Sequence, residues 1–459
     1  MSFAYQAWLL NPFALMSLAI VTGWFLGKIR IGRFELGISG IMFTGMFIGW
    51  AVLQYAQGIP DGSPVFNTAR SLIAADIIDK IYLDLFIILF IASVGLSSAK
   101  DIGAVMKKYG LKFIILGFVI TAVGAGGTYA AALINKDINP YEAAGVYVGA
   151  LTSSPGLGAA LETAKEEARL KIGKYEKMAG DEQDRVLRVL DPSGALRAEN
   201  TPVLNEEQKN QFVKNAEAGV GTGYAVGYPF GVLIVILPMY LLPVIFRINT
   251  QAEKKAYSLE IARAGSAKEN GLLPENAFDL AAFAVVCVFG YTVGMIDVDL
   301  SALGLGHFSL GATGGVLIGA LVLGHIGRLG PLNFRMEEKI LGSIRDIAVG
   351  FFLAAVGLRY GHHAFDAVLK SGLNLALTAI VVGLAAVLAG FILGRFIFKI
   401  NWLVLSGAIC GGMTSTPGLG AAVDATGSDG PAGGYGATYP FALLGMVIFT
   451  IILNKLPML

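Results

Sequence analysis

The sequence predicts an all-α polytopic membrane protein made of two inverted repeats, each with about five transmembrane helices and one re-entrant helical hairpin. Three observations predict this fold. Of the 459 residues, 55% are apolar and only 15% are charged, whereas soluble domains carry about 25% charged residues. The charges gather in two segments, 162–217 and 247–275, which leaves long apolar stretches elsewhere. Finally, many residues of the first half recur at a fixed offset in the second half, which indicates an internal sequence repeat.

Each half consists of four apolar stretches, an interrupted segment and one last span. A helix of about 20 apolar residues crosses roughly 30 Å of hydrocarbon, so about ten spans and two hairpins are expected. In the first half the segments are 8–27, 36–57, 81–99, 110–134, the interrupted 141–163, and 219–246. In the second half they are 277–296, 309–329, 343–360, 372–398, the interrupted 402–426, and 434–456.

Two motifs recur between the halves. Thr-Ser-Ser-Pro-Gly-Leu-Gly starts at Thr152 and Thr-Ser-Thr-Pro-Gly-Leu-Gly at Thr414, an offset of 262 residues. Gly-Tyr-x3-Tyr-Pro-Phe starts at Gly223 and again at Gly434, an offset of 211. The difference of 51 residues matches a charged insertion in the first copy. The expected units are a first membrane repeat (1–247, with the insertion 165–215), a linker (248–275) and a second membrane repeat (276–459).

Lys and Arg in short loops set the expected orientation, since such loops are cytoplasmic. They follow the first and third spans of the first half, but the second span of the second half. The linker 248–275 is also basic. We therefore expect the linker in the cytoplasm, both termini outside, and inverted repeats. Inversion requires the interrupted segments to re-enter; if they cross instead, the repeats are parallel and the insertion is cytoplasmic.

The interrupted segments are the predicted substrate site. Proline and glycine break a helix at each motif, which exposes hydroxyls, amides and a partly positive helix N-terminus that favours anions. Paired half-helix ends of this kind form the central site of many secondary transporters. The alternative is that each motif only kinks a packed helix. The predicted binding residues are Thr152, Ser153, Ser154, Pro155, Gly156, Thr414, Ser415, Thr416, Pro417 and Gly418.

Three more residues are candidates for the same site. Arg359 follows a Val-Gly-Leu run and would grip a carboxylate with its guanidinium, or else extend to the membrane surface as a snorkelling arginine. Tyr228 and Tyr439 belong to the paired Gly-Tyr motifs. They would line the site or else join the aromatic belt at the membrane surface.

Acidic residues in the apolar segments have several interpretations. Asp424 and Glu162 end equivalent hairpin arms. Asp424 is the candidate for coupling to a proton or sodium ion; the alternative for both is a solvated helix end. Asp84 and Asp346 are expected to cap helix N-termini, where a carboxylate is favourable.

Several functions are not indicated. A net charge of +1 gives no basic footprint for nucleic acid. We expect no cofactor and no metal site, because adjacent residues such as His362 and His363 point in different directions on a helix, and there is no Walker motif for ATP. An intramembrane enzyme or a non-transporting receptor is the remaining alternative; catalytic pairs and an output domain are not apparent.

The paired Ser/Thr-Pro-Gly motifs, the Gly-Tyr-x3-Tyr-Pro elements and the Val-Gly-Leu runs at 94–96 and 356–358 resemble the aspartate:alanine exchanger family. The resemblance covers nearly all of both halves. It implies exchange of small organic anions such as aspartate, alanine or succinate across the bacterial inner membrane. It also implies an elevator-type homodimer with a moving transport unit and a static scaffold. A sodium- or proton-coupled symporter of the same fold is the alternative. The short linker and the insertion depart from the family pattern.

Overall fold

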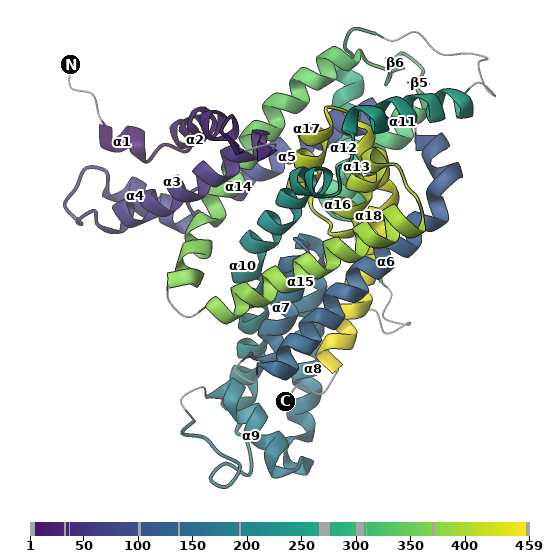
Figure 1. Ribbon diagram of the computed structural model, residues 1–459. Helices are drawn as coiled ribbons and strands as arrows, with labels where there is room; N and C mark the ends of the chain where they lie inside the picture. The colour runs from purple at the N-terminus through teal and green to yellow at the C-terminus, as the bar shows by residue number, and fades with distance from the viewer. Residues whose placement is uncertain are drawn as a thin grey trace.

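The computed structural model is mostly helical (Figure 1). It describes residues 5–31, 34–35, 37–99, 102–135, 138–191, 194–265, 276–299, 307–308, 310–369 and 372–455. The helices up to the linker are α1 (Tyr5–Leu9), α2 (Pro12–Gly27), α3 (Gly40–Gln57), α4 (Phe66–Ala74), α5 (Lys80–Ser98), α6 (Ile102–Ile134), α7 (Pro140–Ala150), α8 (Ser154–Lys174), α9 (Gly180–Leu190), α10 (Glu206–Ile245) and α11 (Thr250–Gly265). Those after it are α12 (Leu280–Gly294), α13 (Gly311–Ile326), α14 (Glu338–Leu369), α15 (Leu373–Ile392), α16 (Trp402–Gly412), α17 (Thr416–Thr426) and α18 (Gly430–Lys455).

Short irregular elements connect the helices. They are the antiparallel pairs β1 (Arg30–Ile31) with β2 (Phe34–Glu35), β3 (Val298–Asp299) with β4 (His307–Phe308), and β5 (Arg328–Leu329) with β6 (Leu332–Asn333), the 3-10 turns η1 (Gly37–Ser39) and η2 (Tyr175–Lys177), and the π-helical turn η4 (Leu393–Ile397). The β pairs follow α2, α12 and α13.

Six helices in the described ranges are long and apolar enough to cross a membrane. They comprise Lys80–Ser98, Val105–Ile134, Glu206–Ile245, Glu338–His362, Leu373–Ile397 and Gly430–Asn454. The shorter apolar helices are α2, α12, α13 and α16. At 1.5 Å per residue, the 16 residues of α2 cover only about 24 Å. The all-α polytopic prediction is confirmed, and the predicted spans 8–27, 277–296 and 309–329 are shorter helices than expected, of 16, 15 and 16 residues.

Helices α7 and α16 lie in the middle of the packed helices rather than at the surface. Almost every residue of α7 and every residue of α16 is buried. Helix α7 packs on α10, and α16 packs on α18. Glycines allow the backbones to touch: a Cβ on Gly145 would stand 2.1 Å from the Val220 carbonyl oxygen, and one on Gly407 would stand 1.7 Å from that of Pro431.

The charged insertion continues the helices on either side of it. Helix α8 extends to Lys174 and α10 begins at Glu206, so the predicted bounds 165–215 fall inside both helices. The Tyr175 hydroxyl donates to the Thr201 carbonyl at 2.6 Å, and Asn215 donates to the carbonyl of Val189 at 3.0 Å. Figure 1 shows α9 and the linker helix α11 at opposite ends of the molecule.

The predicted caps at Asp84 and Asp346 are wrong. Asp79 caps α5, accepting the Ile81 amide at 2.9 Å, and Asp84 instead pairs with Lys80 one turn into the helix. Asp346 lies inside α14, where it contacts Arg345 at 2.9 Å. Both aspartates lie inside their helices, because α5 begins at Lys80 and α14 at Glu338.

Candidate functional site

Each interrupted segment is a pair of helices broken at its motif. The chain leaves α7 at Ala150 and enters α8 at Ser154; it leaves α16 at Gly412 and enters α17 at Thr416. At the break, Thr152 and Thr414 adopt left-handed backbone conformations, with φ of 54° and 49°. Non-glycine residues seldom adopt such angles. The two motifs therefore produce the same local break at both places.

A serine caps the helix that follows each break. Ser153 Oγ accepts the Gly156 amide at 3.1 Å, and Ser415 Oγ accepts the Gly418 amide at 3.2 Å. Proline takes the second position of each helix, where the backbone amide has no intrahelical acceptor. Ser153 and Ser415, which the sequence predicts as substrate-binding residues, thus also stabilise the helix starts.

The two breaks contact each other. Thr152 Oγ1 donates to the Met413 carbonyl at 3.1 Å, and Thr414 Oγ1 donates to the Leu151 carbonyl at 3.0 Å. The contact joins residues more than 260 positions apart in the sequence. It brings the N-termini of α8 and α17 to one place in the structure.

The tips are closed in this structure. Thr152 and Thr414 are 5% exposed, and Ser153 and Ser415 are fully buried. Thr416, Pro417 and Gly418 are buried as well, whereas the side chains of Ser154 and Pro155 lie outside the described residues. The tip hydroxyls that are described are therefore shielded from solvent in this structure.

Both hairpins close at their bases. In the first, Lys171 of α8 lies 5.7 Å from the ring centre of Tyr141, in the first turn of α7. In the second, one linker helix contacts both ends: Glu253 of α11 accepts the Trp402 amide at 2.9 Å, and Lys254 donates to the Gly427 carbonyl. Each segment therefore begins and ends at the same end of the molecule.

The predicted tyrosines are buried beside these hairpins rather than at the molecular surface. Tyr228 is 7% exposed and Tyr439 is 2% exposed. Tyr228 packs on Tyr360, with ring centres 4.6 Å apart, and the Tyr439 hydroxyl donates to the Leu310 carbonyl at 3.2 Å. Tyr435, one turn before Tyr439 in the same motif, approaches a tip: its hydroxyl is 3.5 Å from Thr416 Oγ1.

Arg359 binds the loop between α4 and α5. It donates to the carbonyls of Ala75 and Ile78 at 3.0 and 2.6 Å and pairs with Asp76 at 2.9 Å. Asp76 and Ile77 have φ of 51° and 71°, an uncommon conformation for a β-branched residue. These contacts hold the loop, and the structure does not place the guanidinium at a tip.

Asp424 lies in a cleft next to the second hairpin. Its carboxylate accepts the Tyr240 hydroxyl at 2.8 Å and the Ile38 amide at 3.4 Å. The cleft has a volume of about 410 Å³ and is also lined by Lys28, Arg345 and Asp346. A Cβ on Gly37 would lie 2.1 Å from the Asp424 carboxylate, so only glycine allows this approach. The side chain of Glu162 lies outside the described residues.

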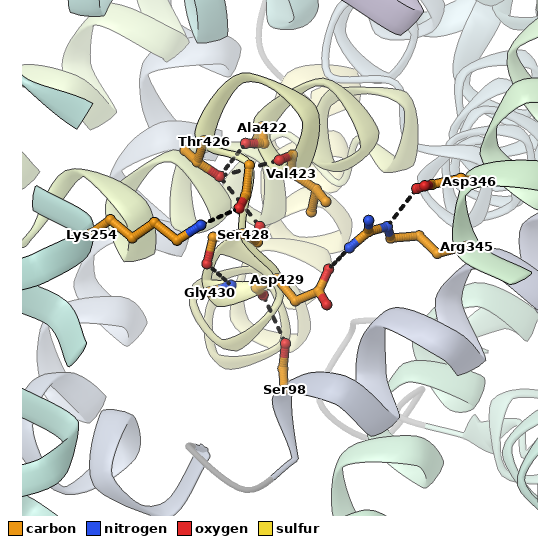
Figure 2. Close-up of polar contacts among 11 residues, drawn as sticks. Ser98, Lys254, Arg345, Asp346, Ala422, Val423, Thr426, Ser428, Asp429 and Gly430 are labelled. Atoms are coloured by element: carbon orange, nitrogen blue, oxygen red, sulfur yellow. Dashed lines mark hydrogen bonds and ion pairs between the residues drawn. The ribbon is translucent and has the colours of Figure 1, made fainter. Parts of the chain in front are cut away.

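A polar cluster that sequence reasoning missed fixes the end of the second hairpin. Figure 2 shows Arg345 of α14 reaching Asp429, in the turn between α17 and α18. The Ser98 hydroxyl donates to the Asp429 carbonyl oxygen at 2.7 Å. Arg345 in the predicted span 343–360 and Asp429 between the last two predicted segments were the available signal, but nothing in the sequence pairs them.

Within the described residues, no three His, Cys, Asp or Glu side chains gather closely enough to hold a metal ion. His362 is buried, and the side chains of His363 and Asp366 lie outside the described residues.

The helices and the paired broken segments define a polytopic α-helical membrane protein of the permease class. The chain belongs to the aspartate–alanine exchanger family: the sequence model of this family, described as a predicted permease membrane region, matches residues 15–244 and 282–455. The unmatched residues between these ranges include α11. The family resemblance seen in the motifs is confirmed.

Known relatives are named as transporters. An uncharacterized transporter of Rhodopirellula baltica is 23% identical over 548 residues, covering 95% of this chain and 97% of the relative. One from Desulfotalea psychrophila is 22% identical and covers 96% of each chain. One from Bacteroides thetaiotaomicron is 35% identical over 177 residues, 39% of this chain, which spans only a third of that relative's length. These names support transport and indicate no substrate.

Proposed function

We propose that the protein is a secondary active transporter that exchanges small organic anions by alternating access. The substrates would be dicarboxylates such as succinate or aspartate, or small amino acids. The observation that carries the proposal is the reciprocal pair of bonds from Thr152 to Met413 and from Thr414 to Leu151. It brings two helix N-termini together, and their partial positive charges favour a carboxylate between them.

Binding would use groups that the closed tips now hold together. The hydroxyls of Thr152 and Thr414 would leave the opposite carbonyls and donate to the carboxylate. The first amides of α8 and α17, those of Ser154 and Thr416, have no intrahelical acceptor and would add two more donors. Ser153 and Ser415 would remain caps and keep both helix ends in position.

Paired contacts support two equivalent repeats as the basis of alternating access, and the basic loops support their inversion. A Cβ on Gly156 would lie 3.3 Å from Met446 of α18, and one on Gly418 would lie 2.8 Å from Val235 of α10. Gly156 corresponds to Gly418 at the offset of 262 residues, and Val235 corresponds to Met446 at the offset of 211 residues. Each hairpin thus contacts the last helix of the other half. We propose the division into repeats 1–247 and 276–459 on this basis.

We further propose an elevator-type homodimer in the bacterial inner membrane, with the linker 248–275 in the cytoplasm and both termini outside. The basic loops support the orientation, as does the separation of α9 from α11 (Figure 1). Labelling of single cysteines in α9 and α11 by a membrane-impermeant reagent would test it. Labelling of both from the same side of the membrane would overturn it.

Exchange is tested with purified protein in liposomes. Liposomes loaded with unlabelled aspartate, succinate or alanine should take up the labelled compound, while unloaded liposomes should not. The Thr152→Val, Thr414→Val double variant should lose this uptake, and the Gly126→Ala variant should retain it, because a Cβ at Gly126 meets no atom within 4 Å. Failure to exchange any small carboxylate would refute the proposal.

A second candidate function is sodium- or proton-coupled symport, which the placement of Asp424 favours. Its exposed carboxylate lines the cleft beside the second hairpin and accepts the Tyr240 hydroxyl. In that case a sodium or pH gradient would drive uptake into unloaded liposomes, and Asp424→Asn would abolish the dependence on the gradient. Uptake that needs only internal substrate would exclude coupling.

A further inference from the structure

We propose that an apolar groove between α6, α13 and α18 binds an acyl chain of an anionic phospholipid. The groove has a volume of about 380 Å³. Its walls include Met106 of α6, Leu321 and Val322 of α13, and Pro440 and Phe441 of α18. All three helices belong to the apolar part of the protein.

The groove exists because the helices touch at one point and diverge beside it. A Cβ on Gly436 would lie 2.6 Å from the Leu321 side chain, so α18 and α13 meet closely there. Next to this contact, Met106 and Val322 remain 41% and 46% exposed. A hydrocarbon chain in this trough would cover apolar side chains over its length, which is favourable roughly in proportion to the area covered.

One end of the groove is basic. His325 is the one polar side chain among its lining residues, and its ring carbon Cε1 would lie 3.3 Å from a Cβ on Gly103. Lys107 stands one turn beyond Gly103 on α6 and is exposed, and Arg328, just past the end of α13, is exposed as well.

These charges lie where apolar helices end, which is the level of lipid headgroups. Helix α13 ends at Ile326, and the apolar stretch of α6 begins at about residue 110, just after Lys107. The neighbouring Lys108 is held by Glu260 at 2.6 Å. A phosphate above the groove would therefore meet Lys107, Arg328 and His325, and its acyl chain would lie along the apolar walls.

The same charges disfavour a second copy of this chain as the occupant. A two-fold axis through the groove would bring Lys107 and Arg328 close to their own copies, and like charges repel. An anionic headgroup instead neutralises them. Each basic residue near an anionic lipid headgroup contributes roughly a 5-fold factor in affinity.

The test measures the thermal unfolding of the purified protein in detergent with added phosphatidylglycerol or phosphatidylcholine, and counts bound lipid by native mass spectrometry. Phosphatidylglycerol should raise the unfolding temperature more than phosphatidylcholine. The Lys107→Gln, Arg328→Gln variant should bind phosphatidylglycerol roughly 25-fold more weakly, whereas Lys339→Gln, a charge change away from the groove, should bind as the unchanged protein does.

A second variant tests the groove itself. Val322→Trp should fill it and remove retained lipid of both kinds, whereas Val288→Trp, on the exposed face of α12, should not. Equal stabilisation by both lipids, or unchanged phosphatidylglycerol binding in the Lys107→Gln, Arg328→Gln variant, would overturn the proposal. So would a dimer that Val322→Trp dissociates without any change in bound lipid, because the occupant would then be a second copy.

Discussion

Thr152 and Thr414 hold the two broken helices together through reciprocal hydrogen bonds, each hydroxyl donating to the carbonyl of the residue before the other threonine. Both residues are 5% exposed and both have a left-handed backbone. Because the contact is buried, removing either hydroxyl leaves a carbonyl without its donor. Under the proposed mechanism, the strength of this contact would set how easily the hairpins separate.

The first prediction concerns these hydroxyls. Thr152→Val and Thr414→Val should each destabilise the protein by about 1–3 kcal/mol, the cost of an unsatisfied buried polar group, and each should reduce exchange. Thermal unfolding and liposome exchange measure the two effects. Thr152→Ser and Thr414→Ser keep the hydroxyl and should keep most of the stability and most of the exchange. Unchanged stability in the valine variants would contradict the two hydrogen bonds.

Gly145 and Gly407 provide the second prediction. A methyl group at either position would collide with a backbone oxygen, at 2.1 Å and 1.7 Å, and backbone cannot move aside as a side chain does. Gly145→Ala and Gly407→Ala should each lower stability by about 1–3 kcal/mol or more. Gly126→Ala in α6, with free space around it, should be neutral or slightly stabilising. Equal effects at all three positions would argue against close helix contact.

The third prediction distinguishes a structural role of Arg359 from a role in substrate binding. Arg359→Gln should release the strained loop at Asp76 and Ile77, lowering the unfolding temperature and making the loop more sensitive to protease. The KM for exchange by the protein that remains folded should not change. A weaker KM with unaltered stability would instead assign the guanidinium to the substrate.

Glu253 tests whether the linker helix holds the second hairpin. It pairs with Arg395 at 2.8 Å and accepts the Trp402 amide at 2.9 Å. Glu253→Ala should speed hydrogen exchange of the amides at 401–403 and lower the unfolding temperature. Lys255→Ala, an exposed position on the same helix, is the control and should alter neither quantity.

The stability of the folded protein should depend on pH in the alkaline range because of Tyr175 in the insertion. Burial raises the pKa of its hydroxyl, so the folded form keeps its proton at a pH where the unfolded form, with a pKa of about 10, loses it. The stabilisation is therefore complete below about pH 10 and is lost as the pH rises towards the folded pKa. Tyr175→Phe should lack this dependence in thermal unfolding measured between neutral and alkaline pH. An identical pH profile in both proteins would refute it.

Local features of the fold were predictable from the sequence. Apolar stretches indicated the helices, and Thr-Ser-Ser/Thr-Pro-Gly indicated both breaks, because proline and glycine act on their own backbone. Helix ends were less predictable. Asp79 rather than Asp84 caps α5, and α8 extends to Lys174, since charged residues continue a helix as well as end it.

The sequence by itself determined that this chain forms membrane helices, that two of its segments are broken in the same way, and that it belongs to the exchanger family. Tertiary structure decided that Thr152 faces Thr414, that Arg359 holds the loop at Asp76, and that Asp424 approaches Gly37. The physical reason is the sequence separation over which each effect acts. Hydropathy and proline act over a few neighbouring residues, whereas these contacts join residues more than 250 positions apart and depend on how the helices pack.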